Sequence, residues 1–165
     1  MRRPVIVVTG LLLVTAGAWA CGDKLMLIMG ARPGLIKPVH PAMVLAYPGR
    51  LASAAVIRNL ELQSVLKKAG HKIQVVEDPA ALENALKGGK YDVVVTDIAN
   101  AAELSHQLPA VPGKPVLLPV AFQTSKQEMA AAQKKYHCLL KAPGSAENYL
   151  TAIDQAMNWK LNASR

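Results

Sequence analysis

Short runs of apolar residues alternate along the chain with longer stretches in which apolar residues recur every three or four positions. The short runs predict strands, and the longer stretches predict helices. The predicted strands cover residues 42–47, 72–77, 91–97, 114–122 and 137–141. The predicted helices lie within residues 51–70, 79–87, 100–108, 125–136 and 145–159. A strand followed by a helix therefore recurs five times.

Polar residues at the predicted helix starts support these helices. Asp78 is a candidate N-cap with Pro79 at the first helical position. Asn100 with Glu103, Ser125 with Glu128, and Ser145 are the candidate caps of the next three helices. Each candidate cap lies at the start of a stretch in which the apolar residues follow the helical spacing.

The five predicted strands are apolar on both faces, which is typical of a parallel sheet covered on both sides by helices. Right-handed crossovers then give a doubly wound, three-layer α/β domain with strand order 2-1-3-4-5. Ligands of such sheets bind beyond the carboxyl ends of the strands. The residues expected around that crevice are Tyr47, Arg50, Asp78, Thr124 and Pro143.

Asp97 ends the third predicted strand, "PVLLPVA" forms the fourth, and "LLKAPGS" ends the fifth. Because of these residues and their order, the stretch 42–159 resembles the receiver domain of two-component response regulators, which has a (βα)5 flavodoxin-like fold. The resemblance implies that Asp97 stands at the phosphate-acceptor position and Lys141 at that of the lysine that pairs with the phosphate. In the family a proline directly follows this lysine, whereas Ala142 separates Lys141 from Pro143 here.

The sequence departs from the receiver pattern at positions that phosphate chemistry requires. Receivers hold Mg²⁺, a cation that needs oxygen ligands, with an acidic pair after the first strand; no Asp or Glu lies between Asp23 and Glu61. Val120 stands where the family carries Ser or Thr. Phosphoryl transfer depends on neutralising and positioning the phosphoryl oxygens. We therefore expect a pseudo-receiver that is not phosphorylated, in which Asp97 and Lys141 form a structural ion pair.

The N-terminus has the layout of a secretory signal peptide. Arg2 and Arg3 precede an uncharged run that ends in "AGAWA". We expect cleavage after Ala20 and export to the bacterial periplasm or beyond, which leaves an arm (21–41), the domain (42–160) and a tail (161–165). An uncleaved membrane anchor is the alternative, although the run is shorter than the roughly 20 apolar residues of a span.

Two cysteines remain after such a cleavage, Cys21 and Cys138. An oxidising compartment permits a disulfide between them. Alternatively, Cys138 is a small buried side chain within its apolar run. Cys21 directly after the cleavage site also raises lipidation as an alternative, but Trp19 and Ala18 differ from the small residue and the leucine of a lipoprotein signal.

Removing Arg2 and Arg3 from the 19 lysines and arginines leaves 17 basic and 11 acidic residues, a net charge of +6. The lysines are scattered and have few aromatic neighbours, so nucleic-acid binding is not expected. The four histidines have no metal-ligand spacing. No nucleophile elbow, phosphate-binding glycine loop or other catalytic pattern occurs, so neither a cofactor nor enzymatic activity is expected.

Three functional hypotheses remain. The first is an exported, non-enzymatic module that contacts another exported or membrane protein, through the face formed by residues 126–137 and 146–159. The second is a small-molecule binder or enzyme that uses the crevice around Tyr47, Arg50, Asp97 and Lys141. The third is a true phosphoreceiver with Asp97 as the acceptor. The sequence does not specify the partner, the ligand or the oligomeric state.

Overall fold

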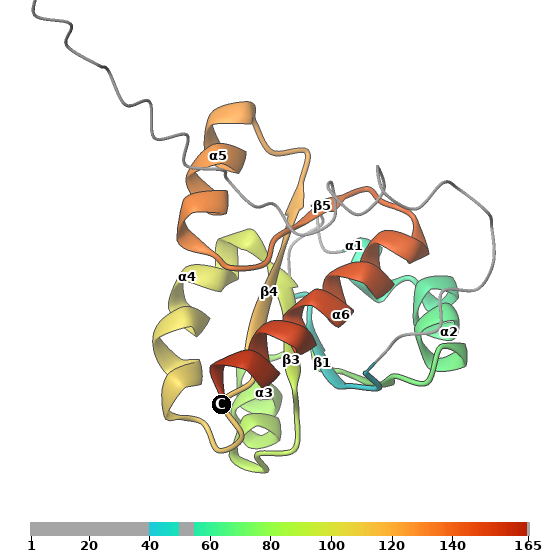
Figure 1. Cartoon of the computed structure of the whole chain (residues 1–165), viewed down its shortest axis with the longest axis vertical. Helices are drawn as coiled ribbons and strands as arrows, with labels where there is room; N and C mark the ends of the chain where they lie inside the picture. Colours follow the sequence, from blue (N-terminus) through green and yellow to red (C-terminus); the bar gives the residue numbers. More distant parts are fainter. Residues whose placement is uncertain (1–39, 50–54, 165) are drawn as a thin grey trace, which may run out of the picture.

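Five parallel strands form one sheet in the order β2-β1-β3-β4-β5 (Figure 1). They come from a computed structural model that describes residues 40–49 and 55–164. The strands are β1 (Met43–Tyr47), β2 (Lys72–Val75), β3 (Val93–Asp97), β4 (Val116–Phe122) and β5 (Leu140–Ala142). The predicted fold class and strand order are confirmed.

Helices cover both faces of this sheet, as Figure 1 shows. They are α1 (Ala55–Arg58), α2 (Leu60–Lys68), α3 (Pro79–Lys87), α4 (Ile98–Gln107), α5 (Lys126–Lys135) and α6 (Ala146–Ala163), with a 3-10 turn (Leu108–Ala110) after α4. One core cluster joins α1, α2 and α6 to side chains such as Val93 and Leu118, which are fully buried. A second cluster joins α3 and α4 to Leu45 and Val94 on the opposite face. A third, smaller cluster joins α5 to Ala121.

Two of the predicted caps are confirmed by hydrogen bonds. The Ala81 N–H donates to Asp78 Oδ1 over 2.7 Å at the start of α3. Ser125 and Glu128 form a complete capping box at the start of α5. Ser145 precedes α6 as predicted, but its side chain makes no capping hydrogen bond.

The region 51–70 does not form the single helix that was predicted. Its described part contains two helices, α1 and α2, that meet at Asn59. Asn59 has extended backbone angles, and its side chain accepts a hydrogen bond from the Glu61 N–H. Asn59 therefore acts as an N-cap in the middle of an amphipathic stretch, a local interaction that the apolar period alone does not reveal.

Four further expectations were wrong in detail. The helix α4 begins at Ile98 with Asp97 as its N-cap, so Asn100 and Glu103 are not its capping pair. β2 is an edge strand whose residues are exposed or half-buried, so it is not apolar on both faces. β5 begins at Leu140 rather than at residue 137. The helix α6 continues through Ala163, so residues 161–163 of the expected tail are helical.

The N-terminal predictions lie outside the described residues. These include the signal peptide (1–20), most of the arm (21–41) and Cys21. Cys138 is described and is 3% exposed in the core between the sheet and α6. Over the described ranges, no helix has both the length and the apolar character needed to cross a membrane.

Candidate functional site

Asp97 lies at the carboxyl end of β3, where the resemblance to receivers placed the phosphate acceptor. Its side chain is 4% exposed. Asp97 Oδ1 accepts a hydrogen bond of 2.9 Å from the Ala99 N–H, in the first turn of α4. This carboxylate therefore stabilises the start of a helix.

Lys141 lies in a different row of the sheet from Asp97. Asp97 pairs with Val120 of β4, which in turn pairs with Leu140 of β5, whereas Lys141 pairs with Ala121. Side chains of successive rows point to opposite faces of a sheet. The side chain of Lys141 is accordingly exposed, while Leu140 is buried in the cluster under α6.

The predicted ion pair between Asp97 and Lys141 is absent from the structure, which describes both residues. The ion pairs found between described side chains are Arg58–Glu77, Glu83–Lys87 and Asp92–Lys160. In the receiver pattern the lysine directly precedes the proline. Here Ala142 directly precedes Pro143, and Lys141 lies one residue earlier in the chain. A one-residue displacement along a strand moves a side chain to the other face, which is why the pair does not form.

The carboxyl end of β1 offers no acidic side chain. β1 ends at Tyr47, followed by Pro48 and Gly49. The described residues contain no group of three His, Cys, Asp or Glu side chains that could hold a metal ion. Val120, beside Asp97 in the sheet, is 2% exposed and apolar. The neighbours of Asp97 in the described strands are therefore apolar where a receiver needs metal ligands and a hydroxyl.

The remaining predicted crevice residues have separate local roles. Asp78 caps α3, and the Thr124 hydroxyl donates to the Phe122 carbonyl oxygen over 3.4 Å. Pro143 is exposed after β5. Arg50 lies outside the described residues. Of the predicted crevice residues, Tyr47 lines an open groove.

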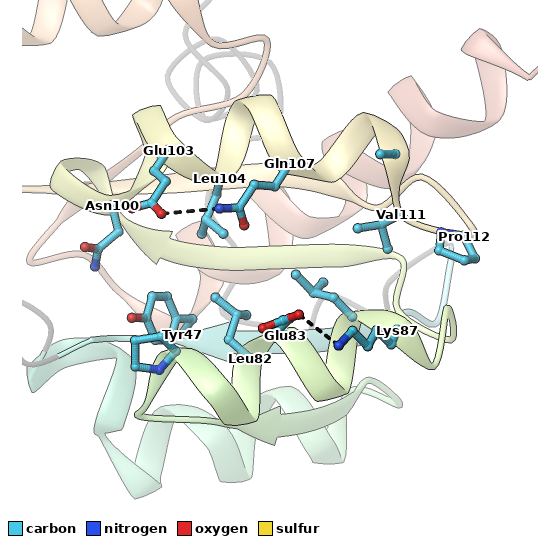
Figure 2. Close-up of a pocket in the computed structure, with 13 residues that line it drawn as sticks. Tyr47, Leu82, Glu83, Lys87, Asn100, Glu103, Leu104, Gln107, Val111 and Pro112 are labelled. Carbon is cyan, nitrogen blue, oxygen red and sulfur yellow. Dashed lines mark hydrogen bonds and ion pairs between the residues drawn. The ribbon is translucent and has the colours of Figure 1, made fainter.

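That groove runs between α3 and α4 (Figure 2). Tyr47 and Asn100 lie at one end, and Val111 and Pro112 at the other. The groove has a volume of about 540 Å³. Its long sides carry Glu83 and Lys87 of α3, and Glu103 and Gln107 of α4.

Comparisons with known proteins rest on structure alone. No family profile matches the sequence, and no curated protein matches it. Among solved structures, the chain is similar to a response regulator receiver protein from Sinorhizobium medicae WSM419, with a TM-score of 0.56 and 20% identity over 74% of this chain and 98% of that one. A response regulator receiver domain protein from Clostridium thermocellum gives a TM-score of 0.54 and 18% identity, over 74% and 98%.

The signal receiver domain of a modulated diguanylate cyclase from Desulfovibrio desulfuricans G20 is a third match, with a TM-score of 0.52 and 17% identity over 75% of this chain and 99% of that one. The described domain is receiver-like in fold. The resemblance seen in the sequence is thereby confirmed at the level of fold.

Apart from Tyr47, sequence reasoning missed the side chains of the groove in the receiver-like domain. Asn100, for example, was predicted as a helix cap, but it lines the groove. Both helices were predicted, but the space between them depends on how far apart they pack on the sheet. No sequence signal reports that distance, because the groove-lining positions look like the ordinary half-buried margin of an amphipathic helix.

Proposed function

We propose that this protein is a non-enzymatic, receiver-like module that acts through protein contact and is not phosphorylated at Asp97. The sheet register supports this proposal most directly, because it turns Lys141 away from the row of Asp97. A phosphoryl group on Asp97 would have no ammonium group from position 141 beside it. Positioning and charge neutralisation together are the main contributions of a protein to phosphoryl transfer.

The surroundings of Asp97 support the same proposal. No carboxylate follows β1 in the sequence up to Glu61, and the side chain next to Asp97 on β4 is that of Val120. Mg²⁺ requires several oxygen ligands. The Asp97 carboxylate already accepts a hydrogen bond from the Ala99 N–H, which gives it a structural role in the start of α4.

The proposed partner surface is the contact face, formed by the exposed sides of α5, β5 and α6. Trp159 on α6 is 41% exposed, and its ring stacks on that of His137 with centroids 4.5 Å apart. Lys134, Lys135 and Lys141 are exposed on α5 and β5. Aromatic residues are enriched in protein interfaces, and the rim that surrounds them is polar. The proposed partner is another exported or membrane protein, in keeping with the signal peptide predicted for residues 1–20.

A phosphodonor assay tests the first half of this proposal. The purified protein is incubated with acetyl phosphate and Mg²⁺, and its intact mass is measured, alongside the Asp97→Ala variant. We expect no gain of the mass of a phosphoryl group in either protein. A gain in the wild type that Asp97→Ala abolishes would establish a working phosphoreceiver and refute the proposal.

Site-specific photo-crosslinking tests the second half. A photoreactive phenylalanine analogue replaces Lys141 on the contact face, and Asn84 on the exposed side of α3 serves as the matched control. We expect a discrete adduct in the producing cells from position 141 and none from position 84. The captured protein is then purified and its binding to wild type and to Trp159→Ala compared. Equal adducts from both positions, or unchanged binding by Trp159→Ala, would contradict a role for the contact face.

A further inference from the structure

The groove between α3 and α4 has the size of a ligand site and an apolar floor. Its volume of about 540 Å³ falls within the roughly 300–1,000 Å³ that is typical of ligand pockets. Leu82, Leu86 and Leu104 line it and are at most 5% exposed. The groove lies on the face of the sheet opposite α6 and away from Lys141. A ligand bound there would therefore act independently of the protein contact proposed above.

Apolar surface remains accessible at both ends of this groove. Tyr47, at one end, is half-buried. Val111, at the other end, is half-buried, and Pro112 beside it is exposed (Figure 2). Covering these side chains would remove apolar area from water, which favours a ligand with an apolar body.

The groove is lined by more negative than positive charge. On α3, Lys87 Nζ lies 2.8 Å from Glu83 Oε1, so these two charges neutralise each other. On α4, Glu103 accepts a hydrogen bond of 3.3 Å from Gln107 Nε2, which is a neutral group and leaves the negative charge of Glu103 uncompensated by that contact. Among the described lining residues there are thus two carboxylates and one ammonium group.

These charges are also separated along the groove. Figure 2 shows Glu103 toward the end with Tyr47, and Lys87 toward the end with Pro112. A cationic group at the first end would lie near a carboxylate and an aromatic ring. Aromatic rings attract cations at their faces, so both groups favour a positive charge there.

The basic character of the whole chain does not oppose a cation in the groove. The net charge of +8 is spread over the molecule. At physiological ionic strength, exposed charges more than about 8 Å apart are largely screened from each other. The charge that a ligand meets is therefore set by the lining itself.

We propose that this groove binds a small organic cation, with an apolar body and one ammonium or guanidinium group. The apolar body lies over Leu82 and reaches toward Val111. The cationic group lies at the other end, beside the carboxylate of Glu103 and the ring of Tyr47.

Four probes separate the charge from the apolar contact in the purified protein. 4-Phenylbutylammonium has both features. 4-Phenylbutan-1-ol and 4-phenylbutanoate keep the apolar body but are neutral and negative, and methylammonium has the positive charge without the body. Binding is followed by the amide chemical shifts of Leu82, Glu103 and Val111 in ¹⁵N NMR spectra.

We expect 4-phenylbutylammonium to bind at least about fivefold more tightly than the alcohol, as one exposed ion pair and one cation–π contact allow. The carboxylate and methylammonium should bind more weakly than the alcohol. The preference for the ammonium probe should shrink in about 1 M salt, where charges are screened over about 3 Å. Equal or tighter binding of the alcohol or the carboxylate, or no saturable shift with 4-phenylbutylammonium, would overturn the proposal.

Four variants locate the site. Glu103→Gln removes the negative charge at nearly constant size, so the preference for the ammonium probe over the alcohol should disappear. Lys87→Gln removes the charge that neutralises Glu83 and should tighten binding of the ammonium probe. Ala110→Trp fills the groove from its exposed rim and should abolish binding of both probes. Glu147→Gln, on an exposed part of α6 outside the groove, is the matched control and should bind as wild type does.

Thermal unfolding confirms that each of these variants is folded. A retained ammonium preference in Glu103→Gln, or its loss in Glu147→Gln, would refute the assignment of the cationic group to Glu103. Unchanged binding by Ala110→Trp, or weaker binding of the ammonium probe by Lys87→Gln, would refute the assignment of the groove.

Discussion

Asp97 and Lys141 lie in adjacent rows of the sheet, and these rows point to opposite faces. The row of Asp97 continues through Val120 to Leu140, and Lys141 comes one residue later. Because side chains alternate along a strand, the two groups that a receiver needs on one side are separated here. The receiver-like fold therefore forms without this pair.

A double-mutant cycle should show that these two residues are energetically independent. We expect the effects of Asp97→Asn and Lys141→Met on the free energy of unfolding to add within about 0.5 kcal/mol, because the side chains are not in contact. Urea unfolding of both single variants and the double variant measures the coupling.

Asp92 and Lys160 provide the matched positive control for this cycle. Their side chains form an ion pair of 2.8 Å and are 29% and 20% exposed. Asp92→Asn and Lys160→Met should therefore show a favourable coupling, on the order of 0.5–1 kcal/mol or more. A larger coupling for Asp97 with Lys141 than for the control pair would contradict the sheet register described above.

Asp97 should matter for stability as the N-cap of α4. Asp97→Ala removes the acceptor of the Ala99 N–H and should lower the free energy of unfolding by about 1 kcal/mol or more. Asp97→Asn keeps an acceptor oxygen and should lower it less. Urea titrations of the two variants measure the difference, and equal losses would argue against a capping role.

Gly49 and Asn100 should show a steric coupling. Gly49 has φ +61°, which costs a residue with a side chain roughly 1–2 kcal/mol, and a Cβ there would lie 2.7 Å from Asn100 Nδ2. Gly49→Ala should therefore destabilise the protein less in an Asn100→Ala background, where the clash is relieved and only the backbone strain remains. Gly70→Ala is the comparison, because Gly70 also has positive φ but no atom within 4 Å of an added Cβ. Its cost should be the same in both backgrounds, as measured by thermal unfolding.

His71 should make the stability depend on pH. It is 2% exposed, and its Nδ1 accepts a hydrogen bond from the Ala42 N–H. Burial lowers the pKa of His71, and the Asp154 carboxylate opposes this in part. The folded state then binds fewer protons than the unfolded state between the lowered pKa and the ordinary value of about 6.5. The free energy of unfolding should therefore fall as the pH is lowered through this window.

The His71→Gln variant isolates that contribution. Its urea unfolding, measured between pH 5 and 8, should depend less on pH than that of the wild type. An unchanged slope would assign the pH dependence to other groups.

Several sequence predictions were accurate because they depend on near neighbours in the chain. The capping bonds of Asp78 and of Ser125 with Glu128 each involve residues at most three positions apart. The spacing of Asn100 and Glu103 fits a capping pair, but Asn100 does not cap α4. The helix begins earlier, at Ile98, because the side chain of Asp97 accepts a hydrogen bond from the Ala99 N–H. The chain offers two possible N-caps for α4, Asp97 and Asn100. Asp97 is the N-cap because β3 ends at this residue.

The sequence by itself determined the order of the elements and the doubly wound fold, since apolar period and turn residues are local properties. It also determined that no carboxylate follows β1 before Glu61, since the residue types at these positions are read directly from the sequence. Only the tertiary structure decided which face Lys141 occupies, because pairing between β4 and β5 sets that register. It also decided that α3 and α4 leave a groove, because the distance between two helices on a sheet depends on the packing of side chains far apart in the chain.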